Sequence, residues 1–211
     1  LDAAVLDPVQ RHRRGGGIES RAGQRAFAAG VAHRQAADGE VLGHTGYSLL
    51  DGGLHAWTNE SRPVEVRRTD PLPTRYQARI RHPEALADKE YVQRHLQSSG
   101  VVVLDARSPA EYNGDDRRAA RGGHIPGAVN LNWTDTMDPD KLNRLKPDKE
   151  LRALLEHRGV TPDKAVVVHC QTHHRSAHSF VVLKHLGYPR VRGYAGSWSE
   201  WGNDPDLPVE Y

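Results

Sequence analysis

Short apolar runs alternate with amphipathic stretches along the second half of the chain. Residues 101–104 and 165–168 are continuous apolar runs of a length typical of buried strands. Ser108 followed by Pro109 is typical of a helix N-cap with proline in the first turn. The pattern predicts strands over 101–104, 128–131, 165–168 and 191–194, and helices over 85–97, 149–158 and 176–185. Apolar strands that alternate with helices indicate an α/β fold with a parallel sheet covered on both faces.

Residues 1–40 follow neither a helix period nor a strand period. The segment is rich in Arg, Ala and Gly, and regular patterning begins only at Val41. Two interpretations are open: a divergent or disordered arm, or an out-of-frame translation of a GC-rich gene. Because the chain starts at Leu1 rather than methionine, we also expect its natural N-terminus to be missing.

Two segments of the chain share a spacing of glycine and tryptophan, which indicates two homologous domains. The matched positions are Gly43, Gly52 and Trp57 in the first copy, and Gly187, Gly196 and Trp201 in the second. The counterpart of Cys170 falls near Ala26, where no cysteine occurs. We therefore expect an inactive, incomplete first domain. The predicted organisation is an unpatterned segment over 1–40, a domain remnant over 41–65, a proline-rich linker over 66–84 and a catalytic domain over 85–211.

The composition is that of an ordinary globular protein, with 37% hydrophobic and 27% charged residues. No apolar run approaches the roughly 20 residues that cross a bilayer. The net charge is only +2, and the basic residues are scattered without interleaved aromatics, which argues against a nucleic-acid partner. One cysteine cannot form an internal disulfide and fits a reducing compartment. We expect a cytoplasmic protein without nucleic-acid or membrane partners.

The single cysteine, Cys170, lies between an apolar strand and a predicted helix. The residues that follow it are Gln171, Thr172, His173, His174, Arg175 and Ser176. Backbone N–H groups in such a loop, together with the helix dipole, form an anion-binding site. A helix N-terminus and cationic neighbours also favour the thiolate form of cysteine. We therefore expect Cys170 to be a nucleophile, with Arg175 and the two histidines as its neighbours.

The segment from His169 to Ser176 resembles the active-site loop of the rhodanese family. It is similar to the Cys-Gln-Thr-His-His-Arg loop of tandem-domain bacterial thiosulfate sulfurtransferases. Residues 105–112, 123–128 and 193–198 resemble further family segments, and residues 50–57 resemble the end of the family's inactive first domain. The resemblance implies a three-layer rhodanese-like α/β domain with a parallel central sheet, preceded by an incomplete homologous half-domain.

The resemblance also implies a reaction. The Cys170 thiolate takes the outer sulfur of thiosulfate, releases sulfite and passes the sulfur from a persulfide to cyanide, a thiol or a protein acceptor. It implies that residues 171–176 bind the substrate, that Asp105 and Arg107 hold the shape of the loop, and that no cofactor or metal is needed. Trp133 either borders the cleft or fills the core.

Gln171 and Thr172 are uncharged, whereas mammalian members place cations directly after the cysteine. A substitute cation for donor binding is expected from Arg175, the histidines, or one of Arg117, Arg118 and Arg121.

Three other interpretations are open. A metal site is disfavoured because its candidate ligands crowd one turn and lack a second half-site; these are His169, Cys170, His173, His174 and His178. The second interpretation is a cysteine phosphatase of the related Cdc25 type. Such enzymes have a longer loop than the four residues between Cys170 and Arg175, and the shorter loop here favours a single sulfur atom over a phosphate. The third interpretation is a non-catalytic remnant or interaction module, since half of the first domain is absent.

Overall fold

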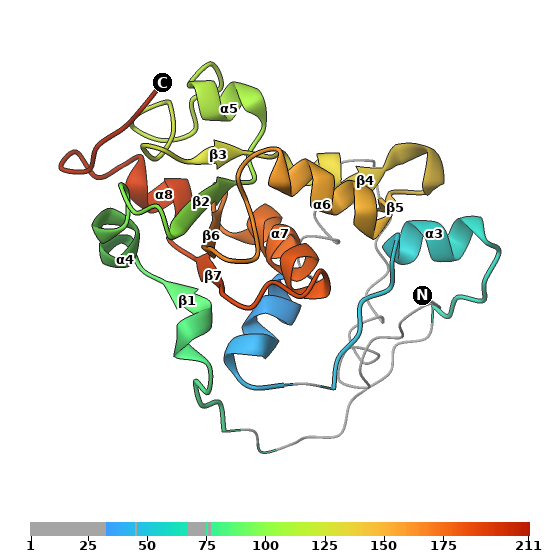
Figure 1. The fold of residues 1–211 in the computed structure, drawn as a ribbon. Helices are drawn as coiled ribbons and strands as arrows, with labels where there is room; N and C mark the ends of the chain where they lie inside the picture. The colour runs from blue at the N-terminus through green and yellow to red at the C-terminus, as the bar shows by residue number, and fades with distance from the viewer. Residues whose placement is uncertain (1–32, 45, 67–74, 76) are drawn as a thin grey trace.

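A parallel sheet of five strands, in the order β1-β7-β6-β2-β3, forms the centre of the computed structural model (Figure 1). The structure describes residues 33–44, 46–66, 75 and 77–211. The strands are β1 Leu86–Ala87, β2 Val101–Asp105, β3 Val129–Asn130, β6 Ala165–His169 and β7 Val191–Tyr194. Every neighbouring pair is parallel. The α/β class and the parallel central sheet are thus confirmed.

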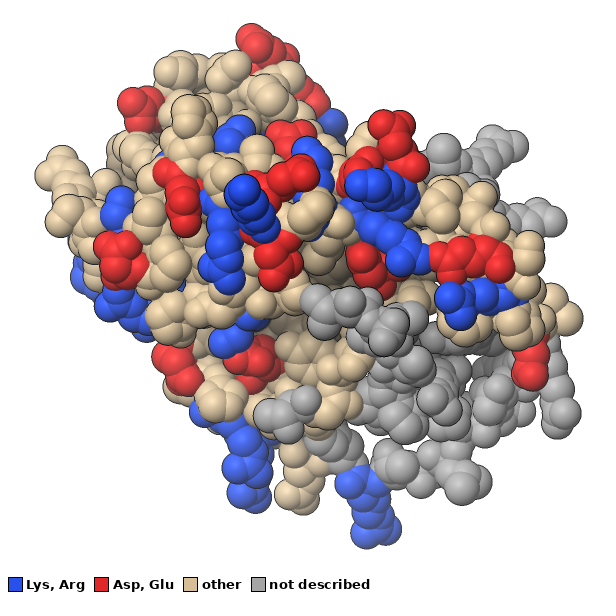
Figure 2. Space-filling model, turned by 45° about the vertical axis from the view of Figure 1, so that its right-hand side comes forward, with Lys and Arg blue, Asp and Glu red and all other residues tan. Residues whose placement is uncertain are grey.

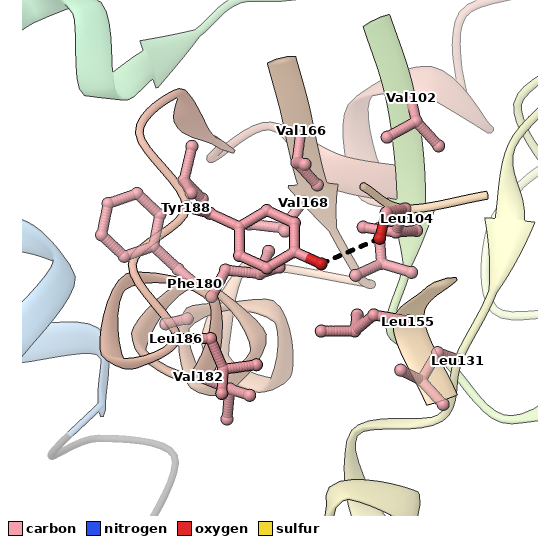
Figure 3. Close-up of a cluster of buried hydrophobic side chains, with 14 of the residues drawn as sticks. Val102, Leu104, Leu131, Leu155, Val166, Val168, Phe180, Val182, Leu186 and Tyr188 are labelled. Atoms are coloured by element: carbon pink, nitrogen blue, oxygen red, sulfur yellow. Dashed lines mark hydrogen bonds between the residues drawn. The ribbon is translucent and has the colours of Figure 1, made fainter. Parts of the chain in front are cut away.

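Helices cover both faces of this sheet, which makes three layers. They are α4 Lys89–Arg94, α5 Pro109–Asn113, α6 Asp148–Glu156, α7 His174–His185 and α8 Ser197–Trp201. Side chains alternate along a strand, so Val166 and Val168 of β6 face one buried cluster and Val167 faces the other. The first cluster lies under α6 and α7 (Figure 3), and the second lies under α4 and α8.

The cluster under α6 and α7 contains one buried hydroxyl, that of Tyr188. It donates a hydrogen bond to the carbonyl oxygen of Val160 at 2.9 Å (Figure 3). A buried polar group costs stability unless it is paired. Because this hydroxyl is paired, tyrosine can fill the core here as a large apolar side chain.

The helix predicted over 85–97 is wrong in its first part. That segment contains the short helix η2 Pro83–Ala85, then β1, then α4, which begins after Asp88. The Asp88 side chain accepts a hydrogen bond from the N–H of Tyr91, as an N-cap does. A two-residue strand is too short to show a period, so only its pairing with β7 defines it.

The other predicted elements agree closely with the structure, and short additions lie between them. The predicted N-cap at Ser108 is confirmed, because Ser108 and Glu111 form a capping box at the start of α5. The additions are η3 Trp133–Thr136, β4 Met137–Asp138, η4 Pro139–Lys141 and β5 Arg144–Leu145, of which β4 and β5 pair in antiparallel fashion.

A helix covers residues 33–41, at the end of the segment in which the sequence shows no regular pattern. Ala36 and Ala37 are buried, and Ala37 joins the cluster under α6 and α7, with Val41 packed beside it. Two alanines are too narrow an apolar stripe to stand out in the sequence, but they are enough to let a helix pack closely. Residues 1–32 lie outside the described residues, as do 67–74 and 76 of the expected linker.

The two copies of the repeat have similar local geometry. α3 Gly53–Asn59 and α8 each follow a glycine and carry a tryptophan. The Trp57 indole donates to the Pro63 carbonyl at 2.8 Å, and the Trp201 indole donates to the Pro208 carbonyl at 2.8 Å. The first copy contacts the main domain through Asp51, which accepts a hydrogen bond from the N–H of Leu145.

Acidic and basic side chains are interspersed on the face that Figure 2 shows. Such mixing is typical of a chain whose net charge is only +2. Within the described part of the chain, no helix has both the length and the apolar character that crossing a membrane requires.

Candidate active site

Cys170 lies at the carboxyl end of β6, in the loop that leads into α7. Its side chain is buried, with 1% of its surface exposed. The N–H groups of Trp198 and Ser199 donate to the carbonyls of Cys170 and Gln171 at 2.9 and 3.0 Å, and the N–H of Cys170 donates to Ser197 Oγ at 3.4 Å. The start of α8 therefore holds the first half of the loop.

Arg175 is the cation that the structure places beside Cys170. Its two terminal nitrogens donate to Glu111 at 2.6 and 2.7 Å. Burial disfavours the guanidinium charge, but hydrogen bonding to Glu111 and the interaction with Cys170 outweigh it and raise the pKa of Arg175. Arg175 therefore keeps its positive charge, and it interacts with the side chain of Cys170.

Glu111 is a site residue to which the sequence analysis assigned no role. Its side chain is 1% exposed on the first turn of α5. Burial opposes ionisation of the carboxyl, but hydrogen bonds from Arg175 and Ser108 outweigh it and lower the pKa of Glu111 to about 2. The sequence signal was its place in the capping box, which predicts a bond to Ser108 and says nothing of Arg175.

His173 supports the loop from within and does not supply charge. It adopts a left-handed backbone conformation with φ of 65° and is 5% exposed. Its ring shares a hydrogen bond with Ser176 Oγ at 2.7 Å and packs on the backbone of Gly193 in β7. Burial, with a smaller contribution from Arg34, lowers the pKa of His173 to about 3, so the ring is neutral at pH 7.

The remaining loop residues lie nearer the surface. Thr172 is exposed, and its hydroxyl is 3.3 Å from Nδ1 of the partly buried His174. Gln171 donates to the Arg118 carbonyl at 3.0 Å, and its buried Oε1 has no hydrogen-bond partner within the described residues. Gln171, Thr172 and His174 thus form the outer part of the loop.

Arg118 is the one of the three basic candidates that adjoins the loop, and it also lies 3.6 Å from Glu111. Arg121 instead donates to the carbonyls of Trp201, Asp204 and Leu207 and ties down the C-terminal segment. The Arg121 guanidinium therefore has a structural role.

Asp105 and Arg107 form a buried ion pair next to the loop. Arg107 Nη2 is 2.6 Å from Asp105 and donates to the Gly123 carbonyl at 2.8 Å, and its guanidinium lies 4.4 Å from the Trp198 ring. His169, directly before the cysteine, has Nε2 3.5 Å from the Asp105 carboxylate. These contacts connect the ends of β2 and β6, as a supporting role requires.

Trp133 packs against α7, where its ring meets His178 edge-on at 5.6 Å. His178 is buried and shares hydrogen bonds with Thr136 at 2.7 Å and with His33 at 3.1 Å. Within the described residues, no three or more His, Cys, Asp or Glu side chains are grouped so that they could hold a metal ion.

Acidification from about pH 7.5 to about pH 5 is expected to destabilise the protein. The unfolded chain protonates histidine near pH 6.5, but burial lowers the pKa values of His173 and His178 in the fold. The unfolded state then binds more protons, so stability present above about pH 6.5 is lost below it, by up to about 1.4 kcal/mol per pH unit for each histidine. Urea unfolding across this range measures the slope, which His178→Asn should reduce. An equal slope in both proteins would contradict the assignment.

The chain is similar to known proteins in sequence and in fold. The sequence-family model of the rhodanese-like domain matches residues 88–204 of the chain. A thiosulfate sulfurtransferase of Azotobacter vinelandii is 49% identical over 172 residues, which cover 81% of this chain and 62% of the relative. The sulfur carrier protein TtuD of Thermus thermophilus is 40% identical over 180 residues, which cover 79% of this chain and 62% of the relative.

Among solved structures, the anaerobic ergothioneine biosynthesis enzyme of Chlorobium limicola in complex with trimethyl histidine has a TM-score of 0.77 and 25% identity, over 85% of this chain and 44% of that one. The chain spans less than two thirds of the length of the curated relatives named above. Because the family model matches more than half of the chain and the fold agrees with it, the chain belongs to the rhodanese family.

Proposed function

We propose that the chain is a sulfurtransferase that carries sulfur on Cys170. In the first half-reaction, the Cys170 thiolate attacks the outer sulfur of thiosulfate. The bond between the two sulfur atoms of the donor breaks, and sulfite leaves with the electron pair. In the second, cyanide or a thiolate attacks the outer sulfur of the persulfide, and the Cys170 thiolate is restored.

The observation that carries the proposal is the position of Arg175 in the first turn of the twelve-residue helix α7, directly after the loop that holds Cys170. Both the thiolate and the persulfide are anions, and a fixed cation with a helix N-terminus stabilises them without reorganisation. The thiosulfate sulfurtransferase of Azotobacter supports thiosulfate as donor. The sulfur carrier protein of Thermus supports a protein as an acceptor.

Two further expectations belong to this proposal. The single cysteine supports a cytoplasmic, reducing location. Trp57 and Trp201 each donate an indole hydrogen bond to the carbonyl of a following proline, and this similarity supports residues 41–65 as the remnant of a homologous inactive domain. The outer loop, with Gln171, Thr172 and His174, is proposed to meet the donor.

Intact mass measured before and after thiosulfate tests the proposal without knowledge of the natural acceptor. The expected result is a gain of about 32 Da, one sulfur atom, that a cyanide challenge removes. Folded protein that gains no mass would overturn sulfur transfer from thiosulfate. Hydrolysis of an aryl phosphate by that same sample would assign the loop to a phosphatase instead.

A further inference from the structure

The Glu111 carboxylate joins α5 to the loop that carries Cys170. On one side it accepts hydrogen bonds from the N–H and the hydroxyl of Ser108, at 3.2 and 3.0 Å. On the other side it accepts hydrogen bonds from both terminal nitrogens of Arg175, at 2.6 and 2.7 Å. These four bonds come from residues 3 and 64 positions away in the chain, so the carboxylate connects two segments that only the fold brings together.

We propose that Glu111 is a positioning residue for sulfur transfer, which holds the Arg175 guanidinium against the Cys170 sulfur. The inference rests on the proposed function and deepens it, because it assigns a role at the same site to a residue that acts through Arg175.

The geometry gives the reason. An arginine side chain has several rotatable bonds, and a partly exposed one samples many orientations unless it is held. A bidentate pair with a carboxylate fixes the plane of the guanidinium as well as its position. With both terminal nitrogens bound to Glu111, the rest of the guanidinium is left to interact with Cys170. The cation is then in place before the thiolate or the persulfide forms, which is the condition for electrostatic stabilisation without reorganisation.

The two charges of the pair act unequally on the sulfur. Arg175 interacts with Cys170, and the Glu111 carboxylate in turn contacts both terminal nitrogens of the guanidinium. We expect the loss of the ordered pair to remove more attraction between the guanidinium and the sulfur anion than repulsion between the carboxylate and that anion, because Coulomb energy falls with distance. Arg118 lies 3.6 Å from Glu111, but its side chain is exposed and also paired with Asp116, so solvent screening weakens it as a replacement.

Glu111→Gln tests the proposal, with Ser108→Ala as its matched control. Both changes remove part of the capping box, but only the first removes the carboxylate that holds Arg175. We expect Ser108→Ala to lower Tm by a few degrees and to keep the rate of persulfide formation within about twofold. We expect Glu111→Gln to reduce that rate by about tenfold or more, the loss typical of removing one oriented stabilising group.

Alkylation of the single cysteine by iodoacetamide provides a readout that does not depend on sulfur transfer. In Glu111→Gln the pH profile of alkylation is expected to move upward by about one unit, and in Ser108→Ala it should stay in place. Equal profiles and equal rates in the two variants would overturn the proposal and assign Glu111 to the capping of α5 alone. If the wild-type protein gains no sulfur but the profile moves, the proposed function fails while the positioning role stands.

A double-mutant cycle shows whether Glu111 acts through Arg175. In an Arg175→Gln background, Glu111→Gln should cause no further loss in alkylation rate or persulfide formation, because the group to be positioned is gone. Independent, additive losses would contradict the proposal. Should Glu111→Gln not fold, Glu111→Asp replaces it in both tests: it keeps the charge on a shorter side chain, and we expect a smaller loss of the same kind.

Discussion

Cys170→Ala is expected to abolish the gain of sulfur from thiosulfate completely. Cys170 is the only cysteine in the chain, so no other thiol can take over as nucleophile. Removing a covalent nucleophile typically eliminates nearly all of the catalysed rate. The measurement is intact mass after thiosulfate, where the wild-type protein gains about 32 Da and the variant gains nothing.

Stability separates loss of chemistry from loss of the fold in this variant. The Cys170 side chain is buried, so alanine leaves a small cavity that costs about 1 kcal/mol. Cys170→Ser retains nearly the same volume and serves as the matched variant. A sulfur gain that cyanide removes from either variant would contradict the assignment of Cys170 as the carrier.

Arg107→Met is expected to lower the free energy of unfolding by about 3–5 kcal/mol, the cost of leaving one member of a buried ion pair unpaired. Asp105 then loses the guanidinium that binds both of its oxygens, and the Gly123 carbonyl loses its donor. Urea unfolding at pH 7.5, about one pH unit above the histidine range, measures the loss.

Lys141→Ala is the matched control for this effect. Lys141 pairs with Asp138 at 3.1 Å, but its side chain is 68% exposed, and such pairs contribute about 1 kcal/mol or less. Similar losses in the two variants would show that the Asp105–Arg107 pair is not the support of the loop. Asp105→Leu combined with Arg107→Met should recover part of the stability, because no buried charge is then left unpaired.

The sequence by itself determined the local elements that carry the chemistry. The strands β2 and β6 are apolar runs, and a run of that kind is visible without knowledge of its neighbours. The Ser108 cap and the loop after Cys170 are likewise local, since each depends on residues a few positions apart. The parallel sheet then followed from the alternation of strands with helices.

The tertiary structure alone decided the rest. The strand β1 exists because it pairs with β7, and the helix over 33–41 is held where its two buried alanines pack. His173 looked like a positive neighbour of the thiol, yet packing on Gly193 leaves it buried and neutral. Glu111 and Arg175 are 64 residues apart. Pairing, burial and charge compensation depend on distances in space, and a sequence pattern reports only distances along the chain.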